Sequence, residues 1–408
     1  MAVSARKILP ILFITLLIDM IGIGMIIPIL PVIFTDPTSP SFLLSGYSVT
    51  EQYLLAGLLT ALFGLTQFLG APLLGELSDV YGRKKLLTLG IGVLAISQLL
   101  FGFGIEIGSL WLLFISRAVA GLAGANFSIA QAAIADITEP KDRAKNFGLI
   151  GAAFGLGFIL GPTLGGWIAH VFESAAAPFW IASALGILNV LSVSLFLPET
   201  HVNRRAEHTF HPLKGIQNIL AAWRDHDARP VYFSSFLYTS GFAFFTSFIG
   251  ILLVSRFGLG ESAIGTYFGV IGVWIVFTQL FVLRILTRYY SERPILRYTL
   301  LFVAACIALY PFMPSVLYIY ALMPLLAIPN GLTMANMGAL VSKSVSADKQ
   351  GAALGINGSL MALSQGLIPL LAGAFSGGFG VSASFLAGGT LVFAAWLILF
   401  VFMKRSTV

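Results

Sequence analysis

Apolar residues run along most of this chain in long blocks that short polar segments separate. A helix that crosses a bilayer needs about 20 mostly apolar residues. Twelve blocks meet this requirement, and each predicts one membrane-spanning helix. The predicted spans are residues 8–33, 51–76, 86–106, 109–136, 144–170, 177–198, 229–256, 261–286, 295–313, 315–342, 350–375 and 381–403. The pattern therefore predicts an all-α membrane protein.

The longest polar segment lies between the sixth and seventh predicted spans. It divides the chain into an N-terminal six-helix bundle at 1–198, a linker at 199–229 and a C-terminal six-helix bundle at 230–408. Four of the five histidines fall in this linker: His201, His208, His211 and His226. They raise the possibility of a metal site, but their spacing matches no compact zinc motif. We favour a solvated linker and expect neither a metal nor a cofactor.

Composition agrees with a membrane setting. Hydrophobic residues make up 58% of the chain and charged residues 10%, whereas soluble domains carry about 25% charged residues. A soluble enzyme and a disordered chain are therefore excluded. The pI of about 9.4 is also typical of nucleic-acid binding, so the distribution of the positive charges decides between the two interpretations.

The positive charges indicate how the chain crosses the membrane. With Met1 in the cytoplasm and the spans alternating, all 23 lysines and arginines except Arg117 and Arg256 lie on the cytoplasmic side. This asymmetry is typical of membrane proteins. We expect cytoplasmic termini, a lipid bilayer around the chain and no nucleic-acid partner. The short loops favour a bacterial inner membrane, and we expect a monomer.

The two halves of the sequence repeat one another. Pro162 recurs as Pro369, 207 positions later, and Asn126 recurs as Asn336, 210 positions later. Two six-helix halves related by an axis along the membrane normal are typical of transporters, with the substrate near the midplane. The alternative is chance similarity among glycine-rich helices.

The loop between the second and third spans contains Gly75, Asp79, Gly82 and Arg83. Gly75 permits close helix packing, and Gly82 permits a tight turn. Asp79 can pair with Arg83 or with the N-terminus of a nearby helix. Such a loop suits a latch that holds and then releases; the alternative is an ordinary positively charged cytoplasmic loop.

The fifth span has small residues at regular spacing. Small residues four apart let helix backbones approach closely in lipid, and a proline is expected to kink the helix. The residues of this pattern are Gly148, Gly157, Gly161, Pro162, Gly165 and Gly166. The pattern suits halves that rock against one another; the alternative is a tightly packed helix without a further role.

Asp19 and Arg117 are the only charges placed deep in predicted spans, where a charge is costly and marks a functional candidate. At 1.5 Å per residue, Asp19 lies roughly 18 Å from the cytoplasmic end and Arg117 roughly 10 Å from the outer end. These depths nearly coincide, so the two either pair or face one polar cavity. Burial disfavours the charged carboxylate and a nearby cation favours it. We therefore expect Asp19 to exchange the coupling proton; the alternative is a static brace.

Uncharged polar residues within the spans are candidates to line a substrate cavity, because each needs a partner in lipid. Hydrogen bonds between helices are the alternative use of such residues. The candidates are Gln67, Asn126, Gln131, Gln279, Asn336, Asn357 and Gln365. The seventh span is also rich in Phe and Tyr, which either wall a cavity for bulky ligands or face lipid.

These motifs resemble the major facilitator superfamily, and within it the drug:proton antiporter branch with twelve spans. The loop at 75–85, Arg117 with Gly121, and the pattern from Gly148 to Gly166 are similar to its signatures. Residues 16–31, 58–87 and 117–201 further resemble tetracycline exporters. The resemblance implies a small-molecule substrate, a proton as the coupling ion, and a role for Arg117 in proton transfer.

Two positions depart from the pattern that this resemblance implies. Val80 stands where the family loop usually has an arginine, and Ile275 aligns with a histidine that tetracycline exporters use in coupling. The resemblance therefore does not carry tetracycline over as the substrate. We expect proton-driven efflux of amphipathic drug-like compounds by alternating access, with Asp79 and Arg83 stabilising the outward-open state.

Other functions stay open. One alternative is an exporter or facilitator of an endogenous metabolite such as a sugar, a siderophore or an organic anion. Another is a membrane receptor or scaffold that does not transport. The sequence has no G-x-x-x-x-G-K-[ST] loop for a nucleotide and no G-x-S-x-G, H-E-x-x-H or C-x-x-C motif. We therefore expect no enzymatic activity.

Overall fold

A computed structural model describes residues 5–124, 126–139, 143–201, 214–225, 228–346 and 349–402. Within these ranges the regular structure is entirely helical. In the same ranges 12 helical stretches are long and apolar enough to cross a membrane, so the predicted number of spans is confirmed. The stretches are Ile8–Thr35, Val49–Tyr81, Arg83–Glu106, Leu110–Ile137, Asn146–Val171, Ala177–Phe196, Arg229–Phe257, Glu261–Tyr289, Glu292–Phe312, Val316–Lys343, Gln350–Phe379 and Val381–Val401.

The chain forms two compact units. The first unit comprises Met1–Ser45, Leu65–Pro212 and Leu259–Gly269, and the second comprises Gly46–Gly64, Leu213–Gly258 and Val270–Val408. Helices α3 (Val49–Tyr81) and α11 (Glu261–Phe277) each contribute residues to both units.

The first unit contains seven complete helices. They are α1 (Ala5–Gly24), α2 (Ile26–Thr35), α4 (Arg83–Glu106), α5 (Leu110–Ala123), α6 (Asn126–Ile137), α7 (Arg143–Val171) and α8 (Ala177–Phe196). Their aliphatic side chains form a buried core in which Leu12 of α1 joins Ile91 of α4, Ile134 of α6 and Val193 of α8. Apolar contact thus fixes α1 among α4, α6 and α8.

Two spans of the first unit are broken near their middle. α1 and α2 together form the first span and are separated at Met25. Pro28 causes this break, because it has no N–H to donate to the Gly24 carbonyl one turn earlier. α5 and α6 together form the fourth span, and Gly124 ends α5 with a short-range bond from its N–H to the Gly121 carbonyl. Both breaks lie near the charges found by sequence.

The second unit contains the helices of the C-terminal half. They are α9 (Lys214–Arg224), α10 (Arg229–Phe257), η2 (Thr278–Val282), α12 (Leu283–Tyr289), α13 (Glu292–Leu309), η3 (Tyr310–Phe312), α14 (Val316–Lys343), α15 (Gln350–Phe379), α16 (Val381–Leu397) and η5 (Ile398–Phe402). Phe245 of α10 packs its ring against Tyr310 at 4.9 Å and Phe385 at 6.0 Å. Phe245 of the seventh span therefore belongs to the core of the unit.

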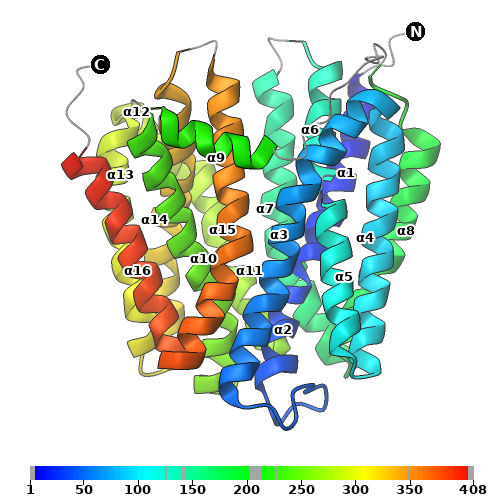
Figure 1. Ribbon diagram of the computed structural model, residues 1–408, viewed down its shortest axis with the longest axis vertical. Coiled ribbons are helices and arrows are strands. Elements are labelled where there is room, and N and C mark those ends of the chain that lie inside the picture. The colour runs from blue at the N-terminus through cyan, green and yellow to red at the C-terminus, as the bar shows by residue number, and fades with distance from the viewer. Residues whose placement is uncertain are drawn as a thin grey trace. The chain divides into compact units, whose positions relative to one another are not determined.

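The linker between the sixth and seventh spans contains a helix that the sequence analysis did not predict. This helix, α9, lies across α15 and α10 (Figure 1). The Asn218 side-chain amide donates a hydrogen bond to the Ser359 hydroxyl of α15 at 3.0 Å. Of the linker histidines, His201 lies in a described segment, whereas His208, His211 and His226 lie outside the described residues.

Candidate functional site

The Asp19 carboxyl group is buried inside the first unit. Its side chain is on α1, five residues before the helix ends at Gly24, and Asp19 is 8% exposed. One carboxylate oxygen accepts a hydrogen bond from the Asn126 amide at 2.9 Å. Asn126 is the first residue of α6, directly after the break in the fourth span. A buried carboxylate with a neutral partner is costly while it is charged, so this group is suited to taking up a proton.

Arg117 does not pair with Asp19 in the described part of the chain, so the ion pair, one of the two arrangements that their depths left open, is not found. The Arg117 guanidinium instead makes a long contact of 3.4 Å with the side-chain oxygen of Gln98. It also lies 4.6 Å from the centre of the Phe101 ring. The Gln98 amide donates to the Gly22 carbonyl of α1 at 3.0 Å. Gln98, on α4, therefore contacts both Arg117 and the helix of Asp19.

Asp19 and Gln98 line a small cavity between α1, α4 and α8. Its volume is about 20 Å³, and the rest of its wall is apolar, with Ile91 and Leu94 from α4 and Ala182 from α8. This volume is enough for about one water molecule. Arg117 is not among the residues that line it. The arrangement can hold a proton on Asp19 with Gln98 as a neighbouring polar group that sequence reasoning missed.

Gln67 supports the break in the fourth span. Its side-chain amide, on α3, donates to the Gly124 carbonyl at 3.1 Å. That carbonyl lies where the regular helix bonding of α5 ends, so it needs a partner in the membrane. Gln67, Asn126 and Asp19 thus gather around one break.

Replacing Gln67 with leucine removes this donor and leaves the Gly124 carbonyl without that bond. Because an unpaired buried polar group costs about 1–3 kcal/mol in proteins and membrane hydrogen bonds average about 0.6 kcal/mol, we expect a loss of about 1 kcal/mol. Thermal unfolding in detergent measures it. Gln131→Leu is the matched control, because no hydrogen bond of that half-buried amide is found among the described residues; equal losses in the two variants would contradict the capping role.

The remaining cavity candidates lie in the second unit and do not form one site there. The Asn357 side-chain oxygen accepts a hydrogen bond from Ser235 at 2.7 Å. Asn336 donates to the Leu332 carbonyl at 2.8 Å, and it lines a polar hollow of about 340 Å³ with Arg288, Glu292 and Lys343. Gln279 and Gln365 are exposed. Interhelical and local hydrogen bonds account for the two buried asparagines.

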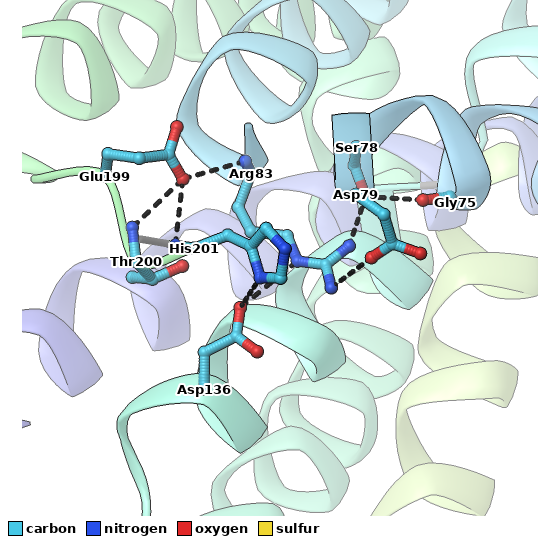
Figure 2. A network of polar contacts seen from close by, with 8 residues as sticks. All are labelled: Gly75, Ser78, Asp79, Arg83, Asp136, Glu199, Thr200 and His201. Atoms are coloured by element: carbon cyan, nitrogen blue, oxygen red, sulfur yellow. Dashed lines mark hydrogen bonds and ion pairs between the residues drawn. The ribbon is translucent and has the colours of Figure 1, made fainter. Parts of the chain in front are cut away.

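Where α3 ends at Tyr81 and α4 begins at Arg83, the residues predicted as a loop are helical except for Gly82. A network of charged and polar contacts is centred there on Arg83 (Figure 2). The buried guanidinium pairs with Asp79 at 2.5 Å and with Asp136 of α6 at 3.2 Å, and it donates to the Ser78 hydroxyl at 2.5 Å. The Ser78 hydroxyl in turn donates to the Gly75 carbonyl at 2.7 Å. Gly82 precedes Arg83 with φ of 100°, a conformation that favours glycine. The junction of α3 and α4 thus contacts the end of α6 as well as its own residues.

The same network reaches the segment that follows α8. The Glu199 carboxylate accepts a hydrogen bond from the Arg83 backbone N–H at 2.9 Å, and His201 lies 3.6 Å from the Asp136 carboxylate. Sequence reasoning missed Ser78, Asp136, Glu199 and His201. A signal was present: Asp136 and Glu199 are acidic residues at span ends where basic residues predominate. Arg83 pairs with two carboxylates, those of Asp79 and Asp136.

The glycines of α7 allow close contact with α1 and α2. A side chain at Gly161 would meet the Gly24 backbone, and one at Gly165 would meet the Met25 backbone; Gly157 faces Met20.

Pro162 does not interrupt α7, which runs without a break from Arg143 to Val171. Gly166 packs on the start of α11, at the Glu261 carbonyl, whereas Gly148 has open space around it. Close packing therefore explains the pattern except at Gly148.

A methyl group at Gly161 is expected to destabilise the protein. In Gly161→Ala the new Cβ would lie 2.8 Å from the Gly24 Cα and 2.9 Å from the Ile21 carbonyl oxygen, and such overpacking costs about 1–3 kcal/mol. Gly151→Ala on the same helix meets open space, so better helix propensity should raise stability by up to about 1 kcal/mol. Unfolding temperatures of the two variants in detergent are the measurement, and changes of the same sign would refute the packing argument.

Known proteins resemble the chain in sequence along most of its length. The model of the family described as Major Facilitator Superfamily matches residues 12–328 and 231–408. The chain is 31% identical to the class C tetracycline resistance protein of Escherichia coli over 373 residues, which cover 86% of this chain and 84% of that protein. It is 29% identical to multidrug resistance protein 1 of Bacillus subtilis (strain 168) over 370 residues, which cover 90% of this chain and 88% of that protein.

The fold also matches a solved structure. The crystal structure of the human organic anion transporter MFSD10 (TETRAN) superposes with a TM-score of 0.71 and 24% identity, and the match covers 97% of this chain and 99% of that one. At this identity the match concerns the arrangement of the helices.

Proposed function

The chain belongs to the major facilitator superfamily, and on that basis we propose that it is a proton-coupled exporter of amphipathic, drug-like compounds. The resemblance and the fold class expected from the sequence are confirmed by the family match and by the 12 candidate spans. Because the family and its matched members are transporters, the chain is a transporter and not an enzyme.

The observation that carries the proposed coupling is the environment of Asp19. Its carboxylate is buried beside a neutral amide, 2.9 Å from Asn126, and no ion pair to it occurs among the described residues. Charge on such a group is costly, so a conformation that buries it favours its protonated form. A conformation that wets it favours proton release. Proton uptake and release by Asp19 would then accompany alternating access, with Arg117 aiding transfer through Gln98.

The substrate class rests on two matched relatives, whose names are a tetracycline resistance protein and a multidrug resistance protein. Efflux of drug-like compounds is the activity that such names support. From its positive charges we place both termini of the transporter in the cytoplasm. We further propose that it is a monomer in a bacterial inner membrane. The Arg83 network would act there as a latch whose contacts break and re-form during the transport cycle.

A proton-flux measurement tests this function. Purified protein is reconstituted into liposomes that contain a pH-sensitive dye, and a pH gradient is imposed. Cationic drugs, tetracyclines, sugars, siderophores and organic anions are added one at a time, with protein-free liposomes in parallel. Substrate flux is followed separately, with and without the gradient.

Three results distinguish a proton-coupled exporter from the alternative functions. Proton movement triggered by amphipathic drugs would support the proposal and identify the ligand class. Substrate flux that needs no gradient and moves no protons would overturn the coupling and indicate a facilitator. The absence of both fluxes for the whole panel would overturn transport of these classes and favour a receptor or scaffold.

A further inference from the structure

The linker helix α9 presents three chemically distinct sides. Helical residues turn about 100° each, so its positions fall into three faces roughly a third of a turn apart. The first face packs on the protein: Gly215 and Ala222 are buried, and Asn218 bonds Ser359 of α15 at 3.0 Å. The helix is therefore held against the second unit by one side only.

The second face of α9 is an exposed apolar stripe. Ile216, Leu220 and Trp223, at helical spacing, are 43%, 50% and 61% exposed. The third face is polar and exposed, with Gln217 and Arg224. Burying apolar surface away from water is favourable. An exposed stripe of this kind is therefore more stable in contact with an apolar environment than in water.

We propose that α9 is an interfacial helix whose stripe of Ile216, Leu220 and Trp223 inserts into the cytoplasmic leaflet of the membrane. An amphipathic helix with Trp and Leu on one face and Arg on another lies in the plane of the interface. α9 lies across α15 and α10 (Figure 1) rather than along them, which is the direction that an interfacial helix requires. Its three faces then contact protein, lipid and water respectively.

Charge and aromatic chemistry favour lipid as the occupant. Trp is enriched at the boundary between lipid and water, because its ring is apolar and its N–H is polar. The Arg229 guanidinium lies 6.0 Å from the Trp223 ring centre, and Arg224 is exposed beside the stripe. These cations suit the anionic headgroups of a cytoplasmic leaflet. The partner is therefore the bilayer that the spans already require.

Spin labels on two faces of α9 test this inference in the full-length protein. The only cysteine, Cys306, is buried and is first replaced by serine. A nitroxide label is then attached at Leu220→Cys on the stripe or at Gln217→Cys on the polar face, as the matched control. After reconstitution into liposomes with anionic lipid, power saturation measures collisions with oxygen, which concentrates in lipid, and with a water-soluble nickel chelate.

We expect the ratio of oxygen to chelate collisions to be several-fold higher at 220 than at 217. Equal ratios, or a label at 220 that is shielded from both reagents, would overturn the proposal; shielding would indicate that protein covers the stripe. If Leu220→Cys does not fold, Ile216→Cys takes its place against the same control. The measurement needs no substrate and no proton gradient, so its failure would leave the proposed transport activity standing.

Discussion

Asp19→Asn is expected to reduce substrate-triggered proton movement to the level of protein-free liposomes. Asparagine has nearly the same shape as aspartate, and its side-chain oxygen can still accept the hydrogen bond that Asn126 donates at 2.9 Å. The variant should therefore fold, because it keeps the contact and removes a charge that is costly to bury. It cannot take up or release a proton, so the coupling is lost. Proteoliposomes with the internal pH dye measure this loss.

Substrate exchange separates coupling from binding in this variant. With equal pH on both sides and substrate on both sides, Asp19→Asn should still exchange labelled substrate, because exchange needs no net proton transfer. The matched control is Asp36→Asn, the same chemical change at a half-buried residue after α2 that bonds Thr38; its proton movement should equal that of the unmodified protein. Normal proton movement in a folded Asp19→Asn protein would remove Asp19 from the coupling step.

Arg83→Ala is expected to cause the largest loss of stability among the changes considered. The alanine variant leaves Asp79 and Asp136 without the cation that pairs with both. Removing one partner of a buried ion pair costs about 3–5 kcal/mol. The side chains of Asp79 and Asp136 are 32% and 21% exposed, so water compensates in part and we expect about 3 kcal/mol. Thermal unfolding in detergent measures the loss.

Two further variants show whether geometry or charge matters at this position. Arg83→Lys keeps the charge but loses the planar guanidinium that contacts several partners at once. Its stability should therefore fall between that of the unmodified protein and that of Arg83→Ala. Lys85→Ala is the control: Lys85 is exposed and lies 5.7 Å from the Tyr81 ring centre, and we expect it to change stability by less than about 0.5 kcal/mol. An Arg83→Ala protein as stable as the unmodified protein would show that the network does not stabilise the junction of α3 and α4.

The spans were predictable because the thickness of a bilayer imposes their length. The seventh span, predicted at 229–256, is Arg229–Phe257 in the structure. The breaks at Met25 and Gly124 were not predicted, because hydropathy averages over side chains and does not register a lost backbone bond. Pro28 carried the signal for the first break. Helix α9 was missed because its exposed stripe repeats every three or four residues and forms no long apolar block.

The candidate site was predictable where charge made a residue unusual. Asp19 could be found because a carboxylate deep in a span is costly, whereas Gln98 is uncharged and does not stand out among other polar residues. Asp136 and Glu199 are acidic residues at span ends where basic residues predominate, but their contacts with Arg83 depend on how α4, α6 and the segment after α8 pack. The similar depths of Asp19 and Arg117 left open whether they pair or face one cavity, because depth along a helix does not determine which face a residue occupies; among the described residues they do not pair.

The two broken spans have a mechanical consequence. A continuous helix transmits tilt along its whole length, but the first span is interrupted at Met25, between α1 and α2, and the fourth at Gly124, between α5 and α6. Rotation at such a break strains few backbone bonds, because the regular ladder is already interrupted there. Asp19 and Asn126 lie beside these breaks. We therefore expect a small change of angle at either break to alter how far water reaches the Asp19 carboxylate without unwinding a helix.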